Sequence, residues 1–248
     1  MKIHKLFFLL ASLLLLAGGC DMFKIDNYEA PNASFRGSIR DAETNALVET
    51  DIQSGSAIRV YEIGWPEGVQ TWVVKQNGEF QNDMVFAAHY RVVFYDCNFY
   101  PFTIDDLEIK KGSNTHDFKV TPYIRIRDAS ITKQGNQIVA TFKLQAGNPE
   151  VRLAAVRLYA FGDMYVGEQV KYNITNNENT NTLCYQTFSP AATIDGNTTY
   201  TLNIDIPSNT NEFFKYNKNY YFRIGALASV SDVGTIRYNY APLVVIPL

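Results

Sequence analysis

The chain has 248 residues, of which 46% are hydrophobic, 14% aromatic and 19% charged. Its net charge is only −3 and no basic run occurs, which argues against nucleic-acid binding because that relies on clustered lysine and arginine. The abundance of Tyr, Thr, Val and Asn, with frequent turn residues and no long helical periodicity, predicts an all-β protein.

Residues 1–19 have the features of an export signal. Lys2 and Lys5 supply positive charge, and residues 6–16 form an apolar run that is shorter than the roughly 20 residues of a membrane-spanning helix. Small residues and Cys20 follow, so the segment resembles a bacterial lipoprotein signal, although Ala17 stands where Leu is usual. The resemblance implies cleavage before Cys20, which then carries lipid. The alternative is an ordinary secretory signal with an incidental cysteine.

Residues 20–32 are polar and lack a clear period, so we expect a tether that carries the lipidated Cys20. The first of two consecutive antiparallel β-sandwich domains is expected over residues 33–120. Alternation and β-branched residues predict strands at 34–41, 56–62, 71–75, 88–95 and 117–120. Asn77-Gly78 predicts a tight turn, because this pair readily adopts positive φ angles.

The first domain resembles a carboxypeptidase-regulatory or transthyretin-like module, which is a seven-stranded sandwich. The motifs that carry the resemblance are, in order, Gly37-x-Ile39-x-Asp41, Ala57-x-Arg59-Val60, Asn77-Gly78-x-Phe80 and His89-Tyr90-Arg91-Val92. Asn77 stands where these modules usually have Asp, and Ala88-His89 precede Tyr90 where Gly is typical. Such modules are usually structural or adhesive.

A second β-sandwich domain is expected over residues 121–248, with Pro122 at the junction because proline rarely occupies a central strand. Strands are expected at 123–127, 137–144, 151–161, 199–206, 220–226, 235–238 and 243–246. The alternation that starts at Tyr220 resembles the penultimate strand of a fibronectin type III or immunoglobulin-like domain. That resemblance implies a tyrosine corner, in which Tyr220 bonds to backbone.

The sequence offers no catalytic, metal-binding or cofactor-binding motif. It lacks closely spaced His or Cys pairs, a Gly-x-Ser-x-Gly string and a phosphate-binding glycine loop. Cys97 and Cys184 fall in different domains and are expected to be small buried residues rather than a disulfide. Asp105, Asp106 and Glu108 are expected in a solvated loop. The alternative is a catalytic pair of acids, which glycan cleavage requires.

Aromatic residues in loops are the candidate ligand-binding residues. Trp65 lies among turn formers, and its ring is able to stack on the C–H face of a sugar. The alternative is that Trp65 folds back to cap the sandwich. Tyr100 and Phe102 belong to a second aromatic loop, which adjoins Trp65 if both loops emerge at one end. Trp72 is expected in the core.

The whole chain resembles the two-domain lipoproteins of Bacteroides-type polysaccharide-utilisation systems. The resemblance rests on Cys20, the tether with Asp26-Asn27-Tyr28 and Pro31, and the two sandwich modules in this order. It implies outer-membrane, cell-surface anchoring and a non-catalytic role in binding polysaccharide or oligosaccharide. Two alternatives remain: a structural or adhesin subunit that binds outer-membrane protein partners, and an enzyme with two acids facing each other across a cleft.

Overall fold

The computed structural model describes residues 29–65 and 68–248. The predicted signal, Cys20 and the tether up to residue 28 lie outside the described residues. Asn32–Leu248 form one compact unit. No helix within the described ranges has both the length and the apolar character to cross a membrane.

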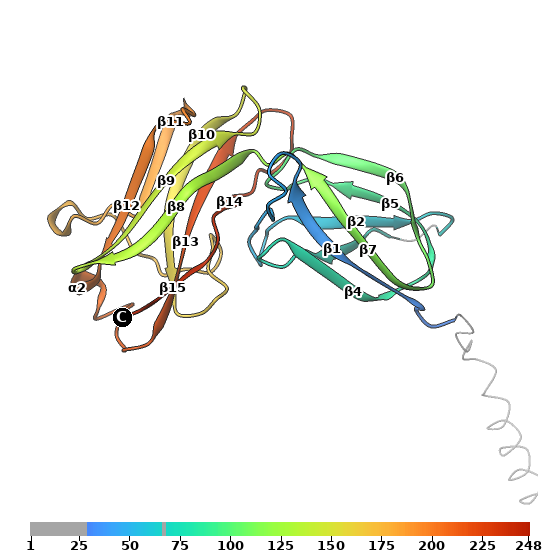
Figure 1. Ribbon diagram of the computed structural model, residues 1–248, viewed down its shortest axis with the longest axis horizontal. Coiled ribbons are helices and arrows are strands. Elements are labelled where there is room, and N and C mark those ends of the chain that lie inside the picture. The colour runs from blue at the N-terminus through green and yellow to red at the C-terminus, as the bar shows by residue number, and fades with distance from the viewer. Residues whose placement is uncertain (1–28, 66–67) are drawn as a thin grey trace, which may run out of the picture. The chain divides into compact units, whose positions relative to one another are not determined.

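The N-terminal half of this unit is a β-sandwich of a three-stranded and a four-stranded sheet (Figure 1). The three-stranded sheet has the order β4-β1-β7, and the four-stranded sheet has the order β3-β2-β5-β6. The strand bounds are β1 Ala33–Asp41, β2 Ala57–Glu62, β3 Gln70–Val73, β4 Glu79–Val85, β5 Ala88–Phe94, β6 Phe102–Ile109 and β7 Gly112–Val120.

Alternation along these strands turns one face of each sheet inward, because successive side chains of a strand point to opposite faces. In β5, Tyr90, Val92 and Phe94 are buried while His89 and Arg91 are exposed. The inward residues form an aromatic core in which the Trp72 ring lies 5.6 Å from that of Phe35. The predictions of two β-sandwiches and of a core position for Trp72 are confirmed.

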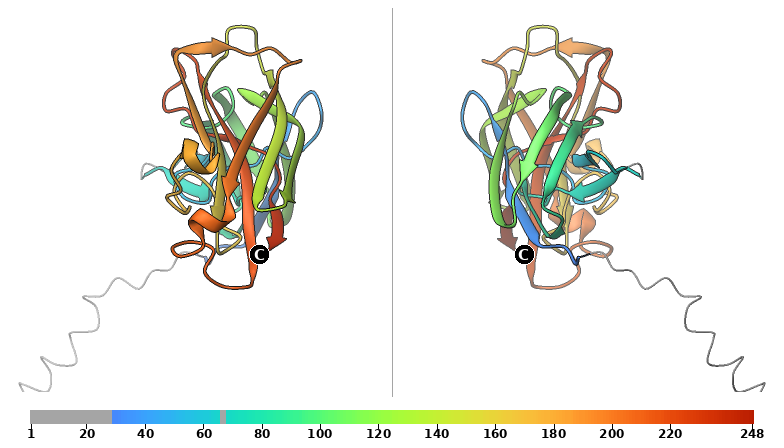
Figure 2. Two further views of the ribbon diagram at one scale, coloured as in Figure 1. Left: turned by 90° about the vertical axis from the view of Figure 1, so that its left-hand side faces the viewer. Right: turned by 90° about the vertical axis from the view of Figure 1, so that its right-hand side faces the viewer.

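The C-terminal half is a second sandwich, whose two layers of strands are visible in Figure 2. One sheet has the order β12-β9-β8, and the other has the order β11-β10-β13-β14 with β15 also paired to β13. The element bounds are β8 Ile124–Gln134, β9 Gln137–Ala146, β10 Arg152–Phe161, η2 Glu178–Thr180, β11 Tyr185–Thr193, β12 Thr199–Asp205, α2 Ile206–Asn209, β13 Asn219–Ser229, β14 Asn239–Tyr240 and β15 Val244–Pro247.

Tyr220 forms the predicted corner at the start of β13. It is fully buried, and its hydroxyl donates to the carbonyl of Tyr216 at 2.9 Å and accepts from the Tyr216 amide at 3.2 Å. The cysteines also behave as predicted, since Cys97 and Cys184 are both buried and unbridged. Tyr220 is therefore a structural residue.

Several features differ from the expectations, including β4, where only the turn at Asn77-Gly78 had been expected. The β1–β7 pair is parallel, whereas the other ladders are antiparallel. Strand β6 was expected to be a loop. It carries an extra residue at Asp105-Asp106, opposite the step from Tyr90 to Val92 of β5, and this bulge breaks the alternation that would have revealed the strand. Strand β11 was not expected. It contains Pro190 and lies at a sheet edge, where a proline without an N–H is tolerated. Residues 235–238 form no strand, and β14 begins only at Asn239.

A buried arginine fastens the two sandwiches together. Arg223 of β13 is fully buried, and its guanidinium donates to the Glu49 carboxylate at 2.6 Å and to the carbonyl of Thr50 at 2.9 Å. It also lies over the ring of Tyr240, 4.0 Å from the centroid. Burial raises the pKa of Glu49, and the adjacent Arg223 charge acts in the opposite direction. The opposite charges of Arg223 and Glu49 therefore offset each other at the junction.

A second ion pair crosses the junction between β1 and β8. The Arg125 guanidinium donates to both carboxylate oxygens of Asp41, at 2.5 and 2.8 Å. Burial alone would raise the pKa of Asp41, but hydrogen bonds from Arg125, the Glu43 amide and Thr44 outweigh it and lower that pKa. Asn98 and Asn239 add amide hydrogen bonds across the same boundary. The sandwiches are joined by a polar network rather than by a linker alone.

The first sandwich has two distinct ends. We call the one where the chain enters at Asn32 the tether end. The Asn32 carbonyl accepts from the Gly112 amide at 3.0 Å, and its side-chain oxygen accepts from the Ala87 amide at 3.0 Å. The register places at this end the starts of β1, β3, β5 and β7 and the ends of β2, β4 and β6. The connecting residues 63–65, 68–69, 86–87 and 110–111 lie here as well. The opposite end, with Asp41 and Asn98, contacts the second sandwich.

Candidate functional site

The outward face of the four-stranded sheet carries exposed aromatic and charged side chains. Tyr61 of β2 is 41% exposed and is paired in register with Arg91 of β5. Paired residues of this kind have Cβ atoms about 5 Å apart, so the two side chains are neighbours. We call this surface the platform and define it by Arg59, Tyr61, His89, Arg91 and Tyr95.

Each cation of the platform has an acidic partner. Arg59 donates to Asp96 at 2.9 Å, Arg91 lies 3.5 Å from Asp105, and His89 lies 2.6 Å from Asp106. The three cations occupy positions two residues apart in register along β2 and β5. They therefore line the face at intervals of about 7 Å, given the rise of a strand. A cation paired with a carboxylate offers hydrogen-bond donors and acceptors side by side, which suits a ligand rich in hydroxyl groups.

The His89–Asp106 pair should make a contribution to stability that depends on pH. The hydrogen bond that His89 donates to Asp106, and then the Asp106 charge, raise the pKa of His89 above the ordinary value of 6.5. Since the folded value is the higher one, the stabilisation from the pair is fully present below pH 6.5 and is lost as pH rises through the folded value. We expect an NMR titration to give His89 a raised pKa that falls in Asp106→Asn. An unchanged pKa in that variant would contradict the pairing.

Tyr95 lies at the end of the platform that faces the junction, and His89 lies at the opposite end. Tyr95 is 43% exposed, and the backbone of Gly234 lies so close to its ring that a Cβ there would approach within 2.6 Å. Gly234 has a φ of +75°, which suits glycine. Tyr95 follows the last residue of β5 and lies four residues after Arg91, or about 14 Å along an extended chain. The platform thus has one tyrosine near each end.

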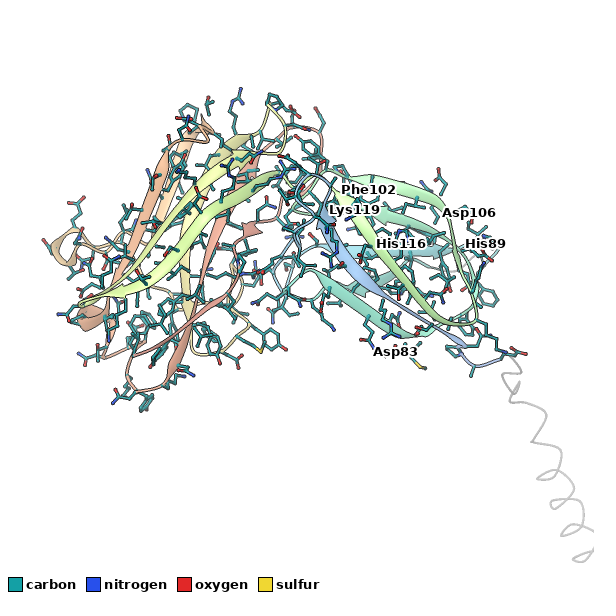
Figure 3. The ribbon with its side chains drawn as sticks, in the orientation of Figure 1. Asp83, His89, Phe102, Asp106, His116 and Lys119 are labelled. Atoms are coloured by element: carbon teal, nitrogen blue, oxygen red, sulfur yellow. The ribbon has the colours of Figure 1, made fainter. Side chains whose placement is uncertain are left out.

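The predicted ligand-binding residues do not gather in one place. Trp65 is exposed and lies in the β2–β3 connection at the tether end. Phe102 pairs with Phe94 at the far end of the same sheet, whereas Tyr90, four residues before Phe94, pairs with Glu62 at the tether end. Figure 3 shows Phe102 well separated from His89 and Asp106. The expectation that the second aromatic loop adjoins Trp65 is therefore wrong.

Tyr100 and Phe102 are also less accessible than a ligand site requires. The Tyr100 hydroxyl donates to Glu150 at 2.7 Å, and its ring packs edge-on against Tyr123 at 4.9 Å. Phe102 stacks on Phe94 at 4.6 Å, against the first core. The sequence showed that these residues were aromatic but not that they were packed. Both stabilise the region near the junction.

The acids expected in a loop lie on strand β6 instead. Asp105 and Asp106 face Arg91 and His89, as described above, and Glu108 lies 3.6 Å from Lys110. Each acid of the cluster therefore has a cationic neighbour. Among residues 29–65 and 68–248, no group of three or more His, Cys, Asp or Glu is arranged to hold a metal ion.

A pocket of about 340 Å³ opens where the two sandwiches meet. Its walls are mainly apolar, with Leu47 on one side and Ile124 and Ile126 on the other. The Asp41–Arg125 pair lies among its lining residues. Both groups are already engaged with each other, whereas the cations of the platform are at least one-third exposed. The platform is the stronger candidate site.

Tyr61 was not identified from the sequence, although a signal for it exists. In the strand Ala57–Glu62, the alternation buries Ile58 and Val60 and turns Tyr61 outward. An aromatic residue on the solvent face of a predicted strand is the pattern that reveals it. The pairing with Arg91 depends on the β2–β5 register, which the sequence does not display.

Comparisons with known proteins agree with this architecture. The model described as "Protein of unknown function (DUF3823) N-terminal domain" matches residues 33–121, and "Domain of unknown function (DUF3823_C)" matches residues 124–244. No match was found among curated protein sequences.

Solved structures extend the similarity over both sandwiches. A crystal structure of a "putative carbohydrate binding protein" from Bacteroides uniformis is 51% identical, with a TM-score of 0.82, and the match covers 88% of this chain and 100% of that one. A DUF3823 family protein from Parabacteroides merdae is 20% identical, with a TM-score of 0.67 and coverage of 88% and 100%. One from Bacteroides ovatus is 19% identical, with a TM-score of 0.67 and coverage of 87% and 98%. The chain belongs to the DUF3823 family.

Proposed function

We propose that the protein is a non-catalytic, lipid-anchored surface protein that binds glycans through the platform. Two observations support glycan binding. The relative that shares 51% of its residues is described as a putative carbohydrate binding protein, and the platform presents exposed tyrosines among paired charges. The lipoprotein-like signal before Cys20 supports lipid anchoring, and the resemblance to lipoproteins of polysaccharide-utilisation systems supports the outer membrane and the cell surface as the location.

The side-by-side placement of Tyr61 and Arg91 is the observation that carries the proposal. An aromatic ring stacks on the apolar face of a sugar, while an adjacent guanidinium donates hydrogen bonds to hydroxyl groups. Tyr95 lies further along the same face. The platform is an open sheet face rather than a deep pocket, so it suits an extended oligosaccharide that lies along β2 and β5.

Replacing Tyr61 with alanine should weaken glycan binding by about tenfold, or about 1.4 kcal/mol, because one stacking contact is lost. We would measure retardation of the soluble chain beginning at Asp21 by affinity electrophoresis in plant, microbial and host polysaccharides. Tyr216→Ala is the matched control, because Tyr216 is a well exposed tyrosine of the second sandwich. Equal retardation of the Tyr61 and Tyr216 variants would refute the platform as the site.

Anchoring is tested separately. Cells that express the full chain would be fed a clickable fatty acid, and we expect label on the protein but none on Cys20→Ser. Label that persists in the variant would contradict attachment at Cys20. This assay does not depend on any glycan.

A second candidate function is a structural or adhesin subunit that binds an outer-membrane protein partner. The polar network at the junction favours it, because Arg223 and Arg125 fix the two sandwiches to each other as a spacer would require. Crosslinking in cells would recover such a partner. Failure of all polysaccharides to retard the chain, together with one crosslinked partner, would select this function.

A further inference from the structure

The tether end of the first sandwich carries a cluster of exposed apolar side chains. Its members are between 38% and 71% exposed and belong to three neighbouring parts of the chain: the β2–β3 connection, the end of β4 and the β4–β5 connection. They are Ile63, Trp65, Val69, Met84 and Phe86. Exposed apolar clusters of this kind mark contacts with another surface.

The position of the cluster indicates which surface that is. Asn32, the first residue of the compact unit, is bonded to Ala87 and Gly112 at the same end. Cys20 lies 12 residues before Asn32, and a chain of this length spans at most about 40 Å. A lipid on Cys20 therefore keeps the tether end nearer to the membrane than the end that bears the second sandwich.

The chemistry of the tether end matches the interface of a bilayer. Tryptophan is enriched at the headgroup level, where its ring is amphipathic, and lysine side chains extend to the polar layer. Lys110 and Lys111 form the turn beside the cluster, and both are exposed. Glu108 and Asp83 lie nearby on strands and are also exposed, so the charge at this end is mixed. Apolar contact with the lipid, rather than attraction to anionic headgroups, therefore supplies most of the free energy of membrane contact. Added salt should have little effect on that contact.

We propose that this tether-end cluster rests on the lipid surface to which the protein is anchored. The proposal rests on the proposed anchoring at Cys20. Ile63, Trp65 and Phe86 enter the interfacial layer of the bilayer, which fixes the orientation of the first sandwich. The platform then stands beside the membrane rather than against it, and the second sandwich extends from the opposite end toward the medium. Trp65 is thereby assigned to lipid and not to sugar.

A chemically tethered chain tests the proposal. The mature chain beginning at Cys20 is coupled through that thiol to a maleimide lipid in phosphatidylcholine vesicles. Cys97 and Cys184 are buried and do not compete for the reagent. Vesicles that contain brominated phosphatidylcholine quench tryptophans located at the acyl-chain boundary. Trp72 is 6% exposed in the protein core, so it serves as an internal reference.

We expect brominated vesicles to remove the Trp65 share of the fluorescence and to leave that of Trp72. Trp65→Phe should abolish the quenching, Phe86→Ser and Met84→Ser should reduce it at least twofold, and Tyr216→Ser should not change it. Equal emission in plain and brominated vesicles would overturn the proposal. So would loss of polysaccharide retardation in Trp65→Phe, because that result places Trp65 in a sugar site. The maleimide link replaces cellular lipidation, so failure here is distinguishable from failure of the fatty-acid labelling.

Discussion

Replacing Arg223 with methionine will lower the free energy of unfolding by about 3–5 kcal/mol, because the change leaves the Glu49 carboxylate at the junction without its partner. Arg223 is fully buried and donates to Glu49 at 2.6 Å. It also donates to the carbonyls of Thr50, Gln76 and Ala241, which lose a donor in the variant. Methionine fills part of the space but supplies no hydrogen bond.

Urea unfolding followed by circular dichroism measures this loss. Arg127→Met is the matched control, because Arg127 makes one exposed hydrogen bond to Gln145 and should change stability by only about 0.5 kcal/mol. The double variant Arg223→Met with Glu49→Met removes both charges, and it should recover much of the loss because the Glu49 carboxylate is no longer left without its partner. Equal stability of the Arg223 and Arg127 variants would show that the junction does not depend on this pair.

Replacing Gly37 with alanine will destabilise the first sandwich by about 3 kcal/mol, since the added methyl group has no space. Gly37 pairs with His116 across the parallel β1–β7 ladder. A Cβ at Gly37 would lie 1.7 Å from the His116 carbonyl oxygen and 2.9 Å from the ring of Phe80. The first of these contacts is with backbone, so a side-chain rotation cannot relieve it, and the strands must separate.

Thermal and urea unfolding of Gly37→Ala and Gly196→Ala give the comparison. A Cβ at Gly196 would meet only the Leu144 carbonyl at 3.8 Å, which is an ordinary contact. We expect the Gly196 variant to unfold within about 1 kcal/mol of the wild type. If both variants unfold alike, the close approach of β7 to β1 is not a requirement of the fold. The presence of glycine at the start of the Gly37-x-Ile39-x-Asp41 motif would then need another explanation.

The platform and the tether-end cluster occupy different surfaces of the first sandwich. Tyr61 and Arg91 face outward from the sheet, whereas Ile63 and Trp65 lie at its end. Variants of Tyr61 should alter only polysaccharide retardation, and variants of Trp65 should alter only quenching in vesicles. If both results are obtained, the protein holds an extended glycan beside a membrane.

The sequence by itself determined the all-β class and the positions of most strands. Alternation of apolar and polar residues is a local property, and it located strands such as Gln137–Ala146 and Asn219–Ser229 within a few residues. It also identified Tyr220 as a corner residue and Trp72 as a core residue. It did not reveal β4, β6 or β11, because an extra residue within β4 and within β6, and Pro190 in β11, interrupt the local alternation.

Only the tertiary structure decided which residues meet. The β2–β5 register brings Tyr61 beside Arg91, and the same ladder separates Trp65 from Phe102. The pairing of Arg223 with Glu49 joins positions that are 174 residues apart. Strand periodicity specifies which face a side chain occupies but not which strands become neighbours, because that choice depends on the long-range burial of both sheets. The candidate sites of this protein arise from that choice.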